Sequence, residues 1–453
     1  MSVQRILPLL LAVLFSVTSF ASAQTTPDKA VSIGPRITTG NFQAVQIAIP
    51  AFELKAGASN GGLEPAFFQK VIYNDLEFFS DFKRVENQAL VEQTQRHDMA
   101  SNQAKDFIDY AEWQRIGAAF VLKGEYAVDA SGRLQLEVRL FNLTTGERAF
   151  GFQYTPLPVS EKRMMAHQIS DDIVKAVFNQ PGIASTQIVF VASAANPRVK
   201  ELYVMDADGD NLRQLTRDNS LAATPCWGMN GTEVYYTSYK DTNPDLWGIQ
   251  IATRKTWVIS RFAGLNYTAD WSAANKRIAL TLGKDGNSEI YTMDRNGNTA
   301  TMKRLTRNAC IDSSPCWNPA GTQMVFTSDR TGTPQIWAMD ADGNNARKLT
   351  YGGNYNDAAV WSPKGDQIAY VGRDGQFDVH VMNVDGTNDF KLTSNQRNNE
   401  DPTYAPDSKH FVFSSNRTGS YEIFIMDDKG NNVHQLTKMN GNAQSPSWSP
   451  LFR

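Results

Sequence analysis

The sequence predicts an N-terminal α/β domain followed by an all-β, six-bladed β-propeller whose C-terminal strand closes the first blade. Two observations lead to this prediction. A hairpin phrase of the type "IWAMDADGNNARKLT" recurs along the C-terminal part of the chain, and the first and last repeats are incomplete in complementary ways. Recurrence at such a period is the sequence sign of a stacked or closed repeat architecture.

The hairpin phrase occurs six times, at spacings of 43 to 46 residues. Its copies begin at Leu202, Leu246, Ile290, Ile336, Val379 and Ile423, and the second copy is degenerate. The last five copies each follow an aromatic-bearing phrase such as "PCWNPAGTQMVFTSDRTG". This second phrase supplies two further strands with period-2 alternation, so each repeat holds four antiparallel strands.

The two ends of the repeat array complete one another. "STQIVFVAS" opens the first repeat without an aromatic strand before it, and "SPSWSPLFR" ends the chain with an aromatic strand and nothing after it. Pairing of these segments completes a blade and closes the ring, which leaves only short sheet edges. We expect the aromatics of the six first strands to fill the space between neighbouring blades. They are Trp227, Trp271, Trp317, Trp361, Tyr404 and Trp448.

The preceding residues have a different pattern. "QAVQIAIPAF" predicts a buried strand, "EPAFFQKVIYNDLEFF" an amphipathic helix, and "RLQLEVRLFNLTTGERAFGFQY" a hairpin. "SEKRMMAHQISDDIVKAVF" predicts a second helix with Ser160 as its N-cap. We therefore expect an α/β domain over residues 36–180, joined through the linker "NQPGIAS" to a propeller over residues 181–453.

The N-terminus has the features of a secretory signal. Arg5 precedes the apolar run "ILPLLLAVLFSVTSF", and "ASA" supplies small residues before a cleavage point after Ala23. An uncleaved membrane anchor is the less favoured alternative, because the apolar run is short for a bilayer. We expect residues 1–23 to be removed and residues 24–35 to form an extended N-terminal segment of an exported chain without a membrane span.

Net charge, cysteine content and one acidic phrase indicate which partners, cross-links and metal sites to expect. The net charge is −3, so no basic surplus points to nucleic acid or anionic lipid. Cys310 and Cys316 are close enough in sequence for a disulfide, which the spacing leaves undecided, and Cys226 is expected to be buried and unpaired. "DADGDN" at Asp206 resembles a calcium loop, but its glycine comes two places early, so a hairpin turn is favoured. No metal and no cofactor is expected.

One short motif suggests an alternative function. "GASNG" around Ser59 fits the G-x-S-x-G pattern of a nucleophilic serine, as in a secreted propeller-containing hydrolase or peptidase. The loop is longer than a sharp nucleophile elbow, the domain is too small for a hydrolase sheet, and the chain has only five histidines. A flexible loop is the favoured interpretation, and no catalytic residue is expected.

The combination of these features resembles the TolB family, whose members are periplasmic components of the Tol–Pal cell-envelope system. The signal sequence, the α/β domain with "IAIPAF" in its first strand, six repeats of the W-S-P-x-G type and the terminal "WSP" carry the resemblance, which covers the whole mature chain. It implies a non-enzymatic protein that supports outer-membrane integrity and envelope constriction during cell division. The implied partners are the lipoprotein Pal, the periplasmic domain of TolA, and other envelope proteins.

The resemblance implies two binding sites. TolA would bind the N-terminal segment, where Val31, Ser32, Ile33 and Ile37 lie in or beside a short extended patch. Such a segment is either a disordered tail or a strand added to a partner's sheet, and the resemblance favours the strand.

Pal would bind one mouth of the propeller. The residues just before each key aromatic are expected in turns that lead into the innermost strands, either as plain solvated turns or as the binding rim. Their acidic members suggest salt-sensitive association. The expected contact residues are Thr224, Thr268, Asp270, Ser313, Ser314, Asn356, Asp357, Glu400, Asp401, Gln444 and Ser445.

Overall fold

The computed structural model describes residues 44–79, 81–85, 108–193 and 196–452. The expected signal sequence and the expected TolA-binding residues lie outside this part. None of the helices in the described residues is long and apolar enough to cross a membrane.

The N-terminal domain is a mixed sheet covered on one face by two helices. Strand order is β3-β1-β4-β5-β6, and β2 also pairs with β4. β1 runs parallel to β3 and β4, whereas β4, β5 and β6 form an antiparallel meander. The strands are β1 Val45–Ala48, β2 Glu53–Leu54, β3 Phe82–Arg84, β4 Phe120–Val128, β5 Arg133–Asn142 and β6 Glu147–Pro158.

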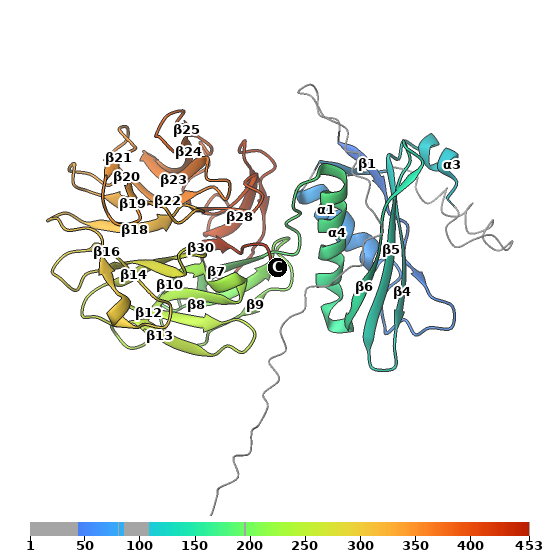
Figure 1. Cartoon of the computed structure of the whole chain (residues 1–453), viewed down its shortest axis with the longest axis horizontal. Helices are drawn as coiled ribbons and strands as arrows, with labels where there is room; N and C mark the ends of the chain where they lie inside the picture. Colours follow the sequence, from blue (N-terminus) through green and yellow to red (C-terminus); the bar gives the residue numbers. More distant parts are fainter. Residues whose placement is uncertain (1–43, 80, 86–107, 194–195, 453) are drawn as a thin grey trace, which may run out of the picture.

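Helices α1 (Phe67–Phe79) and α4 (Lys162–Phe178) lie between this sheet and the propeller (Figure 1). Their apolar stripes, which include Ile72 and Ile169, join the sheet in one buried core. The expected N-cap at Ser160 is wrong. Ser160 lies inside the 3-10 turn η1 (Val159–Glu161), so α4 begins after Glu161 without a side-chain cap. A short helix, α3 (Tyr110–Arg115), precedes β4.

The rest of the chain is a six-bladed propeller, as the sequence predicts. Each blade is a four-stranded antiparallel sheet, and blade one has the order β30-β7-β8-β9. Blade one consists of β30 Ala443–Trp448, β7 Gln187–Ser193, β8 Lys200–Asp206 and β9 Arg213–Gln214; blade two of β10 Ala222–Trp227, β11 Glu233–Ser238, β12 Asp245–Gln250 and β13 Thr256–Ser260; blade three of β14 Asn266–Ser272, β15 Arg277–Leu282, β16 Glu289–Met293 and β17 Lys303–Arg304.

The remaining three blades follow the same plan. Blade four consists of β18 Asp312–Trp317, β19 Gln323–Ser328, β20 Gln335–Asp340 and β21 Arg347–Lys348; blade five of β22 Asn356–Trp361, β23 Gln367–Asp374, β24 Gln376–Asn383 and β25 Phe390–Lys391; blade six of β26 Asn399–Tyr404, β27 His410–Ser415, β28 Glu422–Asp427 and β29 His434–Gln435. Two 3-10 turns, η2 (Met229–Gly231) and η3 (Thr299–Thr301), lie in connections.

The ring is closed by the C-terminal strand. β30 pairs antiparallel with β7, and the innermost strands contact one another in the sequence β10, β14, β18, β22, β26, β30 and back to β10. Trp227 packs among apolar side chains of blades one and two, such as Val189 and Val234, which confirms that an aromatic of the first strand fills an inter-blade space. Its Nε1 donates a hydrogen bond to the carbonyl of Ser447 in β30, 2.8 Å away.

Candidate protein-binding surface at the propeller mouth

Each innermost strand contains a β-bulge at its third residue. In all six blades this residue is not glycine and has a φ of 38° to 54°. The pairing register shifts at the same level of every blade. A left-handed conformation of this kind costs roughly 1–2 kcal/mol per residue and persists only where the surrounding structure imposes it. The six residues, which we call the bulge ring, are Thr224, Thr268, Ser314, Ala358, Asp401 and Ser445.

The bulge ring corrects the sequence prediction on one point. The expected Pal-contact residues were placed in turns before the innermost strands, but the structure puts them inside those strands. A bulge leaves one residue unpaired and changes the direction of the side chains beside it. The expected contact residues therefore belong to the strands that form the channel wall, and not to loops above it.

The bulge ring lies toward the channel mouth that is remote from the α/β domain. Because the strands of a blade alternate in direction, the starts of the first strands share one end with the loops that join second to third strands. The other end carries the hairpins between third and fourth strands. The α/β domain contacts that second end, where Arg163 pairs with Asp208 and Phe78 packs on the ring of His434. We call the remote end the open mouth.

Three carboxylates converge at the bulge ring in blades five and six, where Asp401 belongs to the ring and Asp357 and Glu400 lie directly before ring residues. Asp357 accepts hydrogen bonds from Thr327 Oγ1 at 2.6 Å and Tyr355 OH at 2.9 Å. Glu400 accepts one from Tyr421 OH. Burial raises the pKa of Asp401, and the negative charge of Asp357 adds to this rise. Burial also raises the pKa of Glu400, with a further contribution from Asp401. The three groups therefore share one electrostatic environment.

Two residues at this place, Lys200 and Tyr267, were missed by sequence reasoning. Lys200 Nζ donates to Gln444 Oε1 at 2.8 Å, and burial lowers the pKa of Lys200 against the attraction of Asp401. Burial raises the pKa of Tyr267 to about 12, and Asp401 and Asp357 contribute. Tyr267 occupies the same position in β14 as Asp357 in β22, so alignment of the repeats was the signal that could have found it.

Aromatic and apolar side chains are exposed in two loops that enter the innermost strands from this end. Tyr351 is 81% exposed and Ile311 is 52% exposed. Exposed tyrosine and isoleucine side chains at this end supply the apolar contact area that protein interfaces require. The open mouth thus combines acidic groups, tyrosines and exposed apolar side chains on a rigid frame.

Two of the expected contact residues bond to other parts of the propeller. Asn356 is 3% exposed, and its Nδ2 donates to Gln335 Oε1 and to the carbonyl of Gly352. Asp270 lies further along its strand, next to Trp271, and accepts a hydrogen bond from the Trp317 backbone amide at 2.7 Å. Both side chains hold elements of the propeller together. Asp270 is half-buried, as are the other expected contact residues, which are Thr224, Thr268, Ser313, Ser314, Asp357, Glu400, Asp401, Gln444 and Ser445.

The role of Asp270 predicts a pH-dependent stability. Burial raises the pKa of Asp270 from 3.8 to about 6. Because its pKa is raised on folding, Asp270 binds a proton more tightly in the folded state. Its contribution to stability is therefore complete below about pH 4 and is lost as the pH rises through about 6. Asp270→Asn keeps the acceptor for the Trp317 amide. Relative to this variant, the wild type should lose about 1–3 kcal/mol of unfolding free energy between about pH 4 and about pH 7. Denaturant unfolding at several pH values measures the difference, and a flat difference contradicts the assignment.

The remaining sequence motifs have structural roles. Ser59 is exposed, and its Oγ accepts a hydrogen bond from the Gly61 amide. This bond between residues two apart is typical of a turn formed by a serine side chain. Gly209 has a φ of 89° in the hairpin between β8 and β9, as expected for a glycine-dependent turn. Cys226, Cys310 and Cys316 are all free thiols, so the possible Cys310–Cys316 disulfide is not formed.

Two family models match the chain. The TolB amino-terminal domain matches residues 36–149, and the TolB beta propeller domain matches residues 174–452. The Tol-Pal system protein TolB of Desulfosudis oleivorans is 30% identical over 273 residues, which are 60% of this chain. The chain covers 60% of the length of that relative in this match.

Solved structures agree on the fold. TolB from Acinetobacter baumannii has a TM-score of 0.76 at 24% identity, over 95% of this chain and 99% of that one. Hydrazine synthase of Kuenenia stuttgartiensis has a TM-score of 0.50 at 16% identity, over 58% of this chain and 46% of that one. Because the second protein is a synthase, likeness in fold does not by itself separate binding proteins from enzymes.

Proposed function

The chain belongs to the TolB family, and from this premise we propose that it is the TolB component of a Tol–Pal system. In this proposal it acts in the periplasm as a protein-binding module and not as an enzyme. It binds Pal through the open mouth of the propeller and TolA through its N-terminal segment. These contacts would support outer-membrane integrity and constriction of the envelope during cell division.

The convergence of Asp357, Glu400 and Asp401 at the open mouth is the observation that carries the Pal site. Three half-buried carboxylates attract a partner that brings cationic or amide donors to the channel entrance. Tyr267, whose hydroxyl lies within their electrostatic influence, adds amphipathic contact area. A rigid ring with variable residues at one end is a suitable frame for recognition.

The TolA site rests on the sequence of the N-terminal segment. Val31, Ile33 and Ile37 supply alternating apolar side chains within an otherwise polar stretch. A short extended segment of this kind binds by adding a strand to an exposed sheet edge, where backbone hydrogen bonds give affinity and alternate side chains give specificity. Ser32 would contribute on the opposite face of the same strand.

A paired titration tests this proposal. The mature chain and a form that lacks residues 25–40 are titrated with the soluble domains of Pal and of TolA. The shortened form should lose at least about 100-fold in affinity for TolA, about 2.7 kcal/mol, because the added strand is gone. Its affinity for Pal and its thermal midpoint should stay within error, because the propeller is intact.

A point variant provides the matched control for this experiment. Ile33→Asp in the full-length mature chain should reproduce most of the loss, whereas Thr39→Asp, near the end of the segment, should not. Equal affinity of the shortened and complete forms for TolA would show that the segment is not the binding site. Failure of the complete chain to bind either partner would reject the Tol–Pal assignment itself.

A further inference from the structure

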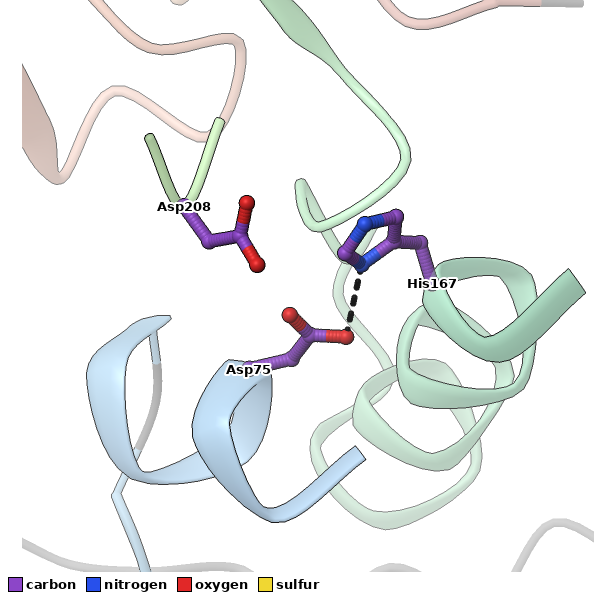
Figure 2. A group of neighbouring side chains, drawn as sticks. All are labelled: Asp75, His167 and Asp208. Carbon is purple, nitrogen blue, oxygen red and sulfur yellow. Dashed lines mark hydrogen bonds and ion pairs between the residues drawn. The ribbon is translucent and has the colours of Figure 1, made fainter. Parts of the chain in front are cut away.

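A buried cluster of ionisable side chains lies where the α/β domain meets blade one. Asp75 comes from α1, His167 from α4, and Asp208 from the hairpin between β8 and β9 (Figure 2). One potential ligand atom of each lies within 4.8 Å of the other two. Asp75 and His167 are each 1% exposed, and the side chain of Asp208 is 2% exposed.

Hydrogen bonds inside the protein leave part of this cluster unsatisfied. His167 Nδ1 lies 2.9 Å from Asp75 Oδ2, which also accepts a hydrogen bond from Ser170 Oγ at 2.7 Å. Asp75 Oδ1 and His167 Nε2 are buried and have no hydrogen-bond partner in the described residues. Each such atom costs about 1–3 kcal/mol of stability when it is left unmet. Figure 2 shows the carboxylates of Asp75 and Asp208 turned toward one another.

The surrounding charges leave a negative excess. Asp206 Oδ2 lies 3.7 Å from His167 Nε2, which brings a third carboxylate to the cluster. Arg163 pairs with Asp208 and lies 3.1 Å from Asp210. Asp210 is largely exposed, but even with His167 protonated the two cations face the three buried carboxylates of Asp75, Asp206 and Asp208. Buried carboxylates that face each other require a shared proton or a cation between them.

We propose that Asp75, His167 and Asp208 form a site for a divalent transition-metal ion that joins the α/β domain to the propeller. One imidazole nitrogen and carboxylate oxygens are ligands that Zn²⁺ accepts at about 2.0–2.2 Å in a tetrahedral site, so a shift of about 1 Å per side chain completes it. Asp206 or water supplies the fourth ligand. Arg163 orients Asp208 from outside, in the way that outer-shell partners fix metal ligands.

This site goes beyond binding of Pal or TolA and departs from the sequence expectation of no metal. Its consequence is mechanical, because its ligands come from both domains. A bound ion stabilises only the arrangement in which α1, α4 and the hairpin of blade one are together. The ion would therefore hold the open mouth and the domain that carries the N-terminal segment in one relative orientation.

Zinc titration of the untagged, chelator-treated mature chain tests the proposal. Calorimetry should give one Zn²⁺ per chain, and excess Zn²⁺ should raise the thermal midpoint by several degrees, since an ion that binds the native state alone stabilises it. Asp208→Asn is the deciding variant. The hairpin turn that holds Asp208 depends on Gly209, so the substitution should leave the fold intact. It should weaken Zn²⁺ binding at least tenfold and remove the thermal shift.

The chain offers a matched control in blade four. Asp342 occupies the equivalent place in the hairpin "DADGNN", but it is exposed. Asp342→Asn should bind Zn²⁺ as the wild type does. Absence of stoichiometric binding by the wild type would overturn the proposal and leave a protonated ion-pair network. Binding that survives Asp208→Asn but is lost with Cys316→Ser would also overturn it, because the ion would then bind in the channel wall.

Discussion

A chain that ends before Ser445 should lose more than about 5 kcal/mol of unfolding free energy, which lowers the thermal midpoint by at least about 10 °C. Most of β30, the innermost strand of blade one, is then missing, so its ladder with β7 is lost. Trp448 is 5% exposed, and its Nε1 donates to Thr186 Oγ1 at 2.7 Å. Removing a buried tryptophan alone costs about 3–5 kcal/mol.

Differential scanning calorimetry of the mature chain measures this effect. Trp448→Ala should account for about half of the loss, because it keeps the backbone pairing but removes the buried ring. Deletion of residues 25–40 at the other end of the chain provides a comparison in which the midpoint should not move. If the chain without residues 445–453 unfolded at the same thermal midpoint as the complete mature chain, the ring would not depend on its closing strand.

The propeller could be predicted because its information is repeated. Six copies of a hairpin phrase fix the number of blades, and the broken repeats at Gln187 and Trp448 fix the closure. The bulge ring was not predicted, because none of its six residues is glycine, the usual sign of a positive φ. Proline follows the bulge residue in four blades, for example Pro225 and Pro402. Proline has no amide to pair in a ladder, so a proline within a strand often marks a bulge. The four prolines were therefore the sequence signal from which the bulges could have been predicted.

The candidate sites were predicted less completely for a related reason. The acidic residues near the mouth are visible in the sequence, but a bulge decides which of them face the channel, and Asn356 and Asp270 turned out to be structural. The interdomain cluster gave only a partial sequence signal, because Asp208 lies in the "DADGDN" phrase that resembles a calcium loop. Asp75, His167 and Asp208 come from three elements whose meeting depends on how α4 docks on blade one, and no local pattern encodes that contact.

Reversing a charge at the open mouth should weaken Pal binding by about 1–3 kcal/mol, roughly 5- to 150-fold. Glu400→Lys and Asp357→Lys are the preferred variants, because their carboxylates are half-buried and bonded to side-chain hydroxyls. Asp401 accepts hydrogen bonds from both the amide and the hydroxyl of Ser445, each at 3.1 Å. Asp401→Asn is therefore the gentler change there, since it keeps an acceptor while it removes the charge.

The salt dependence of these variants separates a lost electrostatic contact from a disturbed fold. If the carboxylates attract a cationic edge of Pal, the affinity of the wild type for Pal should fall as salt is raised from about 50 to about 300 mM. The affinity of Glu400→Lys should fall less steeply over this range, or should rise. A variant that merely distorts the bulge ring would lower affinity equally at both salt concentrations. Asp342→Lys, on an exposed outer hairpin at the other end of the propeller, is the matched control and should change neither value. Equal, negligible effects of Glu400→Lys, Asp357→Lys and Asp342→Lys would place the Pal site elsewhere, since three converging carboxylates cannot lie within a charged contact and leave its affinity unchanged.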